Sequence, residues 1–152
     1  MPFHDRLVVD RERLCNDALN TGVAATLIGG FALGNMDISY GVAIYVISSI
    51  AVHACTCSCL TSAFIYRTMN TMHDDDALAW AARHSWLLKL PFLKFVMGCG
   101  CYLATVIVLS WEALAPHAAA RYATLAIGVL SMSSVGVTHL ILARDSPAKE
   151  KD

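Results

Sequence analysis

The sequence has few charged residues, and the positions without charge are grouped. Asp, Glu, Lys and Arg make up 15% of the chain, against roughly 25% in soluble domains. Four stretches contain none of them: 18–36, 38–66, 95–111 and 122–143. A bilayer core about 30 Å thick takes roughly 17 to 25 helical residues, and a charge at its centre costs about 2.5 to 3.5 kcal/mol. These stretches therefore predict four membrane-spanning helices. A buried soluble bundle is the alternative, but it would not need four runs of this length.

Other absences exclude whole classes of protein. Residues 1–16 are charged and have no apolar core, so we expect no cleavable signal peptide. No Ser-His-Asp arrangement, phosphate-binding glycine loop or suitably placed carboxylate pair suggests an active site, so we expect no enzyme. The basic residues form no nucleic-acid patch, and we expect no nucleic-acid partner.

The basic residues are distributed unevenly about the four runs. If the N-terminus is cytoplasmic, ten of the 11 Lys and Arg residues fall on the cytoplasmic side and only Arg121 falls outside. Short cytoplasmic loops carry the excess of Lys and Arg in membrane proteins. We therefore expect both termini and the middle loop to face the cytoplasm.

The chain then divides into a cytoplasmic helical extension over 1–17, a four-helix transmembrane domain over 18–143 and a cytoplasmic tail over 144–152. The spans are expected at 18–36, at 39–66, from about Pro91 to before Pro116, and at 122–143. Pro91 either starts the third span or kinks it. A helix over 77–88 is expected to follow three aspartates, since carboxylates favour a helix N-terminus.

Asp37 is one of two acidic residues on the predicted outer side, with Glu112. It can be a solvated turn residue that caps the second span. Alternatively, one carboxylate per subunit around a symmetry axis forms a ring of hard oxygen ligands for a cation such as Ca²⁺.

The first span is rich in Gly and Ala, which allow helix backbones to approach closely. Gly30 and Gly34 form a small-xxx-small pair, with Gly22, Ala25 and Gly29 nearby. These residues serve either ordinary packing within one chain or the crowding of copies of this helix around an axis.

Two histidines lie inside the apolar runs, His53 in the second span and His139 in the fourth. Ionisable residues inside a membrane face the bundle interior and are functional candidates. Structural hydrogen bonding to a neighbouring helix is the alternative to metal binding or proton relay.

Six cysteines raise the possibility of a metal or redox site. Cys55, Cys57 and Cys59 follow one another at every second residue, which places Cys57 on the opposite side of a helix from the other two. Cys99 and Cys101 are spaced in the same way, and neither CxxC nor a zinc spacing occurs. We interpret them as packing residues.

Read in order, four segments resemble the Orai family of store-operated calcium channels. Span one carries GGFALGNMD, similar to the family's SGFAMVAMVE pore segment. Span two carries Ala51-Val52-His53, like the family's AVH. Span three carries ATVIVLSW, ending at Trp111, like AEVVLLCW, and span four carries Val137-Thr138-His139, like a second AVH.

This resemblance implies a calcium channel that is a symmetric homo-oligomer with span one lining the pore, in the plasma membrane rather than an organelle membrane. Calcium would be the permeant ion, bound transiently at Asp37, and no cofactor is expected. An ungapped match places the family's filter glutamate on Ile38, one residue beyond Asp37. The resemblance assigns structural or gating roles to His53, Thr105 and His139. From Asp37 inward, the implied pore residues are Gly34, Phe31, Gly30, Leu27 and Val23.

A rival hypothesis is a non-conducting accessory subunit of a larger membrane complex. Its Gly- and Ala-rich faces would pack against partner membrane subunits, and its other contacts would be with lipid. Small size and a near-absent soluble portion fit this hypothesis equally well.

Overall fold

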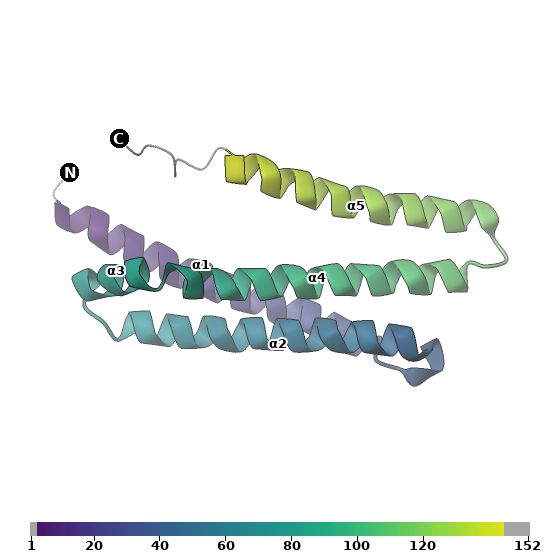
Figure 1. Cartoon of the computed structure of the whole chain (residues 1–152), viewed down its shortest axis with the longest axis horizontal. Helices are drawn as coiled ribbons and strands as arrows, with labels where there is room; N and C mark the ends of the chain where they lie inside the picture. Colours follow the sequence, from purple (N-terminus) through teal and green to yellow (C-terminus); the bar gives the residue numbers. More distant parts are fainter. Residues whose placement is uncertain (1–2, 145–152) are drawn as a thin grey trace. The chain divides into compact units, whose positions relative to one another are not determined.

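The computed structural model describes the backbone of residues 3–144 and the side chains of residues 11–134 and 136–138. This part of the chain is helical throughout and holds no strand, which confirms the predicted all-α class. Its elements, labelled in Figure 1, are α1 (Phe3–Leu33), the 3-10 turn η1 (Ile38–Tyr40), α2 (Val42–Asn70), α3 (Asp74–Arg83), α4 (Ser85–Ala113) and α5 (Ala118–Arg144).

Three of the described helices, α2, α4 and α5, are long and apolar enough to cross a membrane. They coincide with the predicted second, third and fourth spans, and the chain is accordingly a helical integral membrane protein. Helix α1 is not among the three, although its second half carries no charge. Gly, Ala, Thr and Asn fill many of its positions, where the other helices have larger apolar side chains. The fourth crossing remains a prediction.

Helix α1 is continuous from the N-terminal segment into the charge-free run, and it ends at Leu33, earlier than the expected boundary at 36. The helix expected over 77–88 is interrupted. Helix α3 ends at Arg83, and α4 begins at Ser85 and contains Pro91 in its second turn. Pro91 therefore lies inside the helix and beyond its first turn, where it cannot donate the hydrogen bond that a helical residue normally gives to the carbonyl oxygen four residues earlier.

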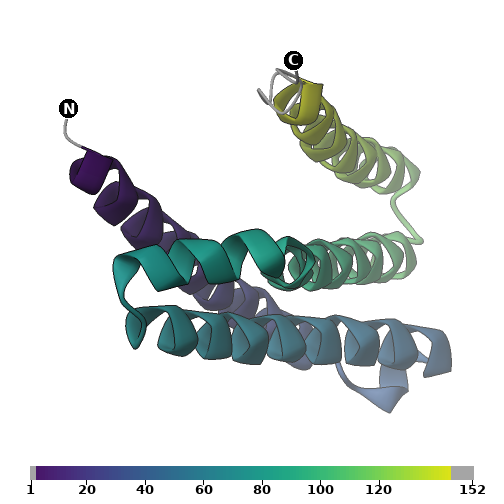
Figure 2. The ribbon, with the colours of Figure 1, turned by 60° about the vertical axis from the view of Figure 1, so that its left-hand side comes forward.

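The chain packs as two compact units, residues 1–102 and residues 103–152. In the first unit, α1 and α2 run antiparallel and are joined by the turn that holds η1 (Figures 1 and 2). The buried residues of α2 follow one another in steps of three and four, which is the spacing of a heptad seam. The seam consists of Ile44, Ser48, Ala51, Cys55, Ser58, Ser62, Ile65 and Met69, and the remaining buried residue of α2, Ala54, lies next to Cys55.

Helix α1 presents a matching seam of small residues to α2. Its buried or half-buried members have the same spacing and are Cys15, Ala18, Gly22, Ala25, Gly29 and Ala32. Gly22 lies opposite Ser62 and Gly29 opposite Cys55, because a Cβ added to either glycine would come within 3.1 Å of the facing Cβ. Small residues on both sides allow the two backbones to approach closely, which maximises van der Waals contact where lipid supplies no hydrophobic driving force.

At the far end of α2 from η1, helix α3 packs against the first half of α1 (Figure 2). Cys15 and Ala18 of α1 join Ile65 and Met69 of α2 and two alanines of α3 in one buried cluster. Arg11 adds polar contacts to it. Its Nε lies 2.7 Å from an Asp74 carboxylate oxygen, and its Nη1 donates to the Met72 carbonyl oxygen at 3.0 Å. The N-terminal part of α1 is thus attached to the corner between α2 and α3.

The beginning of α4 packs against α2 through small and polar residues. Ser58 Oγ donates to the Pro91 carbonyl oxygen at 2.7 Å, and Lys94 Nζ donates to Thr61 Oγ1 at 3.2 Å. A Cβ added to Gly98 would lie 2.4 Å from Cys55 Sγ and 3.2 Å from the Ala51 carbonyl oxygen, so a larger residue would require Cys55 and the helix contact to shift.

In the second unit, the end of α4 and α5 form an antiparallel hairpin. The Trp111 ring meets the Tyr122 ring edge-on, with 5.6 Å between their centroids. Gly128 faces Ile107 closely enough that an added Cβ would lie 2.7 Å from the Ile107 side chain.

Candidate functional site

Asp37 lies beyond the end of α1, in the turn that leads to η1. Its backbone is extended, and its Oδ1 accepts a hydrogen bond from the Ser39 amide at 2.8 Å, so it caps η1. The Ser39 backbone and side chain hold the pKa of this fully exposed carboxyl below its usual value. Asp37 is therefore an ionised, solvent-facing carboxylate at neutral pH.

The predicted pore-lining residues of α1 share one uncovered stripe. Val23 is 55% exposed and Leu27 59%, and a Cβ added to Gly30 would meet nothing within 4 Å. At about 100° per residue, this stripe lies roughly 130° around α1 from the seam that contacts α2. Packing among the described residues of the first unit thus leaves this face free.

Two of the predicted pore residues lie off this stripe. Gly34 follows the last residue of α1 and belongs to the turn, with its amide 3.4 Å from the Gly30 carbonyl oxygen. The Phe31 ring leans toward α4, where its centroid lies 6.3 Å from that of Tyr102. Phe31 nonetheless remains 59% exposed.

Packing within the chain accounts for some of the small residues of this segment and not for others. Gly22, Ala25 and Gly29 serve packing within the chain, because they form the seam with α2. Gly30 is open, and an added Cβ at Gly34 would meet only the Phe31 carbonyl oxygen, at 3.4 Å. Gly30 and Gly34 are therefore the two that packing in the described part of the chain leaves unexplained.

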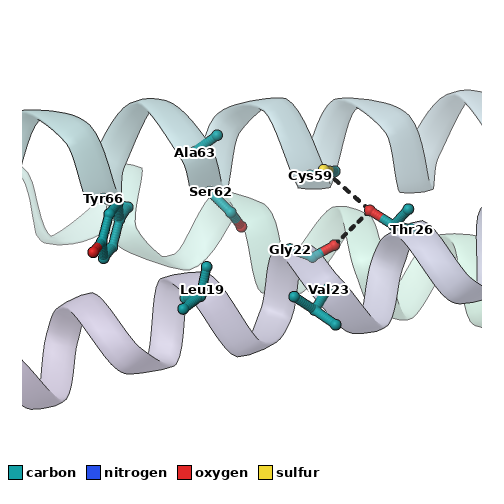
Figure 3. A pocket seen from close by; sticks show the side chains of 8 residues that line it. All are labelled: Leu19, Gly22, Val23, Thr26, Cys59, Ser62, Ala63 and Tyr66. Carbon is teal, nitrogen blue, oxygen red and sulfur yellow. Dashed lines mark hydrogen bonds between the residues drawn. The ribbon is translucent and has the colours of Figure 1, made fainter.

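A groove runs along one side of the α1–α2 pair, which the sequence did not indicate. It holds two hollows of about 200 and 320 Å³ that share Thr26 and Cys59. Figure 3 shows the first hollow: Thr26 Oγ1 lies 2.9 Å from the Gly22 carbonyl oxygen and 3.2 Å from Cys59 Sγ, and Ser62 points toward Gly22. The step of three and four residues in both helices is the signal that could have located this interface.

The histidines and Thr105 lie in different settings. His53 is exposed on α2, and no hydrogen bond connects its side chain to α1 within the described residues. His53 lies two residues, or about 200°, from the seam residue Cys55, which places it away from the contact between α2 and α1. Thr105 is buried in α4. His139 belongs to α5, but its side chain lies outside the described residues.

The six cysteines are all free thiols, and they occupy both buried and exposed positions. In the part of the chain with described side chains, no three His, Cys, Asp or Glu residues come together as a metal site. Burial raises the pKa of the Cys15 thiol, against a smaller opposing effect of the Arg11 guanidinium. Cys15 is therefore a neutral thiol at pH 7 and packs in the α1–α2–α3 cluster.

Comparisons with models of protein families, with curated proteins and with solved structures found no match for this chain.

Proposed function

We propose that the protein is an Orai-like cation channel, with calcium as the expected permeant ion, in which α1 helices of several identical subunits surround the pore. The observation that carries this proposal is the division of α1 into two faces. One face of small residues packs on α2, while the stripe of Val23, Leu27 and Gly30 is left uncovered.

The composition of α1 supports the same arrangement. Seven of the 16 charge-free residues over 18–33 are Gly or Ala, so α1 offers lipid less apolar side-chain surface than α2, α4 and α5, which are the helices apolar enough to face lipid in the described part of the chain. A less apolar helix in a membrane is best placed toward other helices or a water-filled path. The apolar stripe would then form a constriction that closes by dewetting.

The position of Asp37 completes the proposal. It is fully exposed, ionised and located just beyond the outer end of the stripe. Repeated around an axis, this carboxylate would form an acidic ring at the pore mouth. The family's filter glutamate aligns with Ile38, one residue after Asp37. On a helix this offset would point the two side chains in different directions. Asp37 lies in a turn beyond α1, so helical register does not set the direction of its carboxylate.

The test is cation flux through the purified protein in liposomes. Asp37→Asn is expected to abolish the preference for divalent over monovalent cations, because it removes the ring's charge while keeping its size. Asp75→Asn, an exposed carboxylate on α3, is the matched control and should change nothing. Unchanged conductance and ion preference in Asp37→Ala would refute the filter assignment.

The accessory-subunit hypothesis is separated by copurification. A homo-oligomer that conducts after reconstitution supports the channel. Recovery with different partner subunits, together with no flux from the isolated chain, would overturn it.

A further inference from the structure

The second unit carries a cationic side chain with no acidic partner at the predicted membrane boundary. Arg121 Cζ lies 3.7 Å from the centroid of the Trp111 ring, so the guanidinium is stacked on the indole face. Tyr122 meets the same indole edge-on at 5.6 Å. The three residues come from the adjoining ends of α4 and α5, and they form one cluster, here termed the Arg121 cluster.

The contacts of Arg121 leave its charge uncompensated. Its Nε is covered by protein yet has no hydrogen-bond partner, and its side chain forms no ion pair with Glu112 or any other carboxylate in the described part of the chain. The π face of Trp111 attracts the cation but cannot accept in-plane N–H hydrogen bonds. The two Nη groups also have no hydrogen-bond partner within the described residues but are not enclosed by protein, so an anion outside the protein can bind them and compensate the charge.

The location of the cluster indicates the kind of anion. Arg121 is the last charged residue before the charge-free run 122–143, and Trp111 is the last residue of the charge-free run 95–111. Both residues therefore lie at the ends of predicted membrane spans. Trp and Tyr gather at the level of lipid headgroups, where the phosphates of phospholipids lie. The planar fork of a guanidinium binds two oxygens of one phosphate at once.

We propose that the Arg121 cluster binds the headgroup phosphate of a phospholipid. The indole holds one face of the guanidinium, so that its N–H edge is directed to the phosphate, and the acyl chains lie along the apolar surface of the α4–α5 hairpin. The site does not depend on ion conduction and would exist in a channel or an accessory subunit alike.

The test is lipid retention by the purified full chain, measured by native mass spectrometry. Phosphatidylglycerol should remain bound through detergent stripping, while a diacylglycerol with the same acyl chains, which has no phosphate, should be lost. Arg121→Gln should reduce phosphatidylglycerol retention about tenfold, the effect expected for losing charge-assisted hydrogen bonds. Arg67→Gln, in the last turn of α2 on the predicted cytoplasmic side, is the matched control and should retain the lipid.

Two further measurements make the outcome decisive. Arg121→Lys keeps the charge and should recover part of the retention. The comparison of phosphatidylglycerol with diacylglycerol uses the unmodified chain, so its result does not depend on whether a variant folds. Equal retention of the two lipids, or full retention by a folded Arg121→Gln variant, overturns the proposal. Inorganic phosphate that displaces phosphatidylglycerol at millimolar concentration would also overturn it, since the site would then bind free phosphate and not a lipid.

Discussion

At the scale of single residues, the buried serines of α2 differ in their hydrogen bonding. Ser58 donates to the Pro91 carbonyl oxygen, whereas Ser62 Oγ is buried and has no partner within the described residues. Both serines are almost fully buried in the same helix. They therefore form a natural pair for measuring the value of one hydrogen bond between helices.

Ser58→Ala is expected to lower the free energy of unfolding by about 0.5 to 1.5 kcal/mol, because a hydrogen bond is lost. Ser62→Ala should leave it unchanged or raise it, since a buried hydroxyl without a partner is removed. Reversible unfolding in mixed micelles measures both. An equal loss of unfolding free energy in the two variants would show that the Ser62 hydroxyl also forms a hydrogen bond, contrary to its contacts in this structure.

At the scale of elements, α1 has one face that packs on α2 and another that the described residues leave uncovered, and adjacent glycines lie on these two faces. Gly29 lies in the seam against Cys55, while Gly30 faces open space. The same substitution at these two positions changes helix propensity equally, so a difference between them reports packing.

Gly29→Leu should destabilise the chain by about 1 to 3 kcal/mol relative to Gly30→Leu, because the larger side chain must separate α1 from α2. Thermal unfolding of the two purified variants checks this. Similar melting temperatures would mean that α1 and α2 do not meet along this seam.

The exposed stripe of α1 offers a second matched pair. Leu27 and Leu33 are each 59% exposed, but Leu33 lies roughly 120° around the helix from Leu27, nearly off the stripe. If the stripe forms a hydrophobic constriction, Leu27→Ser should wet it and increase resting cation leak in liposomes, and Leu33→Ser should not. Equal leak from the two variants would place the constriction elsewhere.

At the scale of the whole molecule, the number of crossings decides where the ends lie. Three spans, α2, α4 and α5, place the termini on opposite sides of the membrane, and a fourth span through α1 places them on the same side. The uneven distribution of basic residues predicts the second arrangement.

Epitope tags at the two termini test this directly in intact cells. Neither tag should bind antibody until the membrane is permeabilised, whereas a tag inserted beside Ser39 should bind without permeabilisation. Surface labelling of the N-terminal tag alone would show that α1 does not cross the bilayer.

The family resemblance bears on the same scale. The pore residues are those that the resemblance implies, and no known protein matched the chain in support of it. The support that α1 lends to a pore comes from its own packing: the small face is used within the chain and the Val23–Leu27 stripe is not.

The sequence by itself determined the all-helical class and the positions of α2, α4 and α5, because long charge-free runs can satisfy their backbone polar groups in a membrane only as helices. It could not show which glycines of α1 pack within the chain, since that depends on the register between α1 and α2. It offered a turn position for Asp37, but it could not show that Asp37 caps η1, that His53 faces outward, or that Arg121 stacks on Trp111. These features depend on the ends and rotations of helices, which only contacts between distant residues decide.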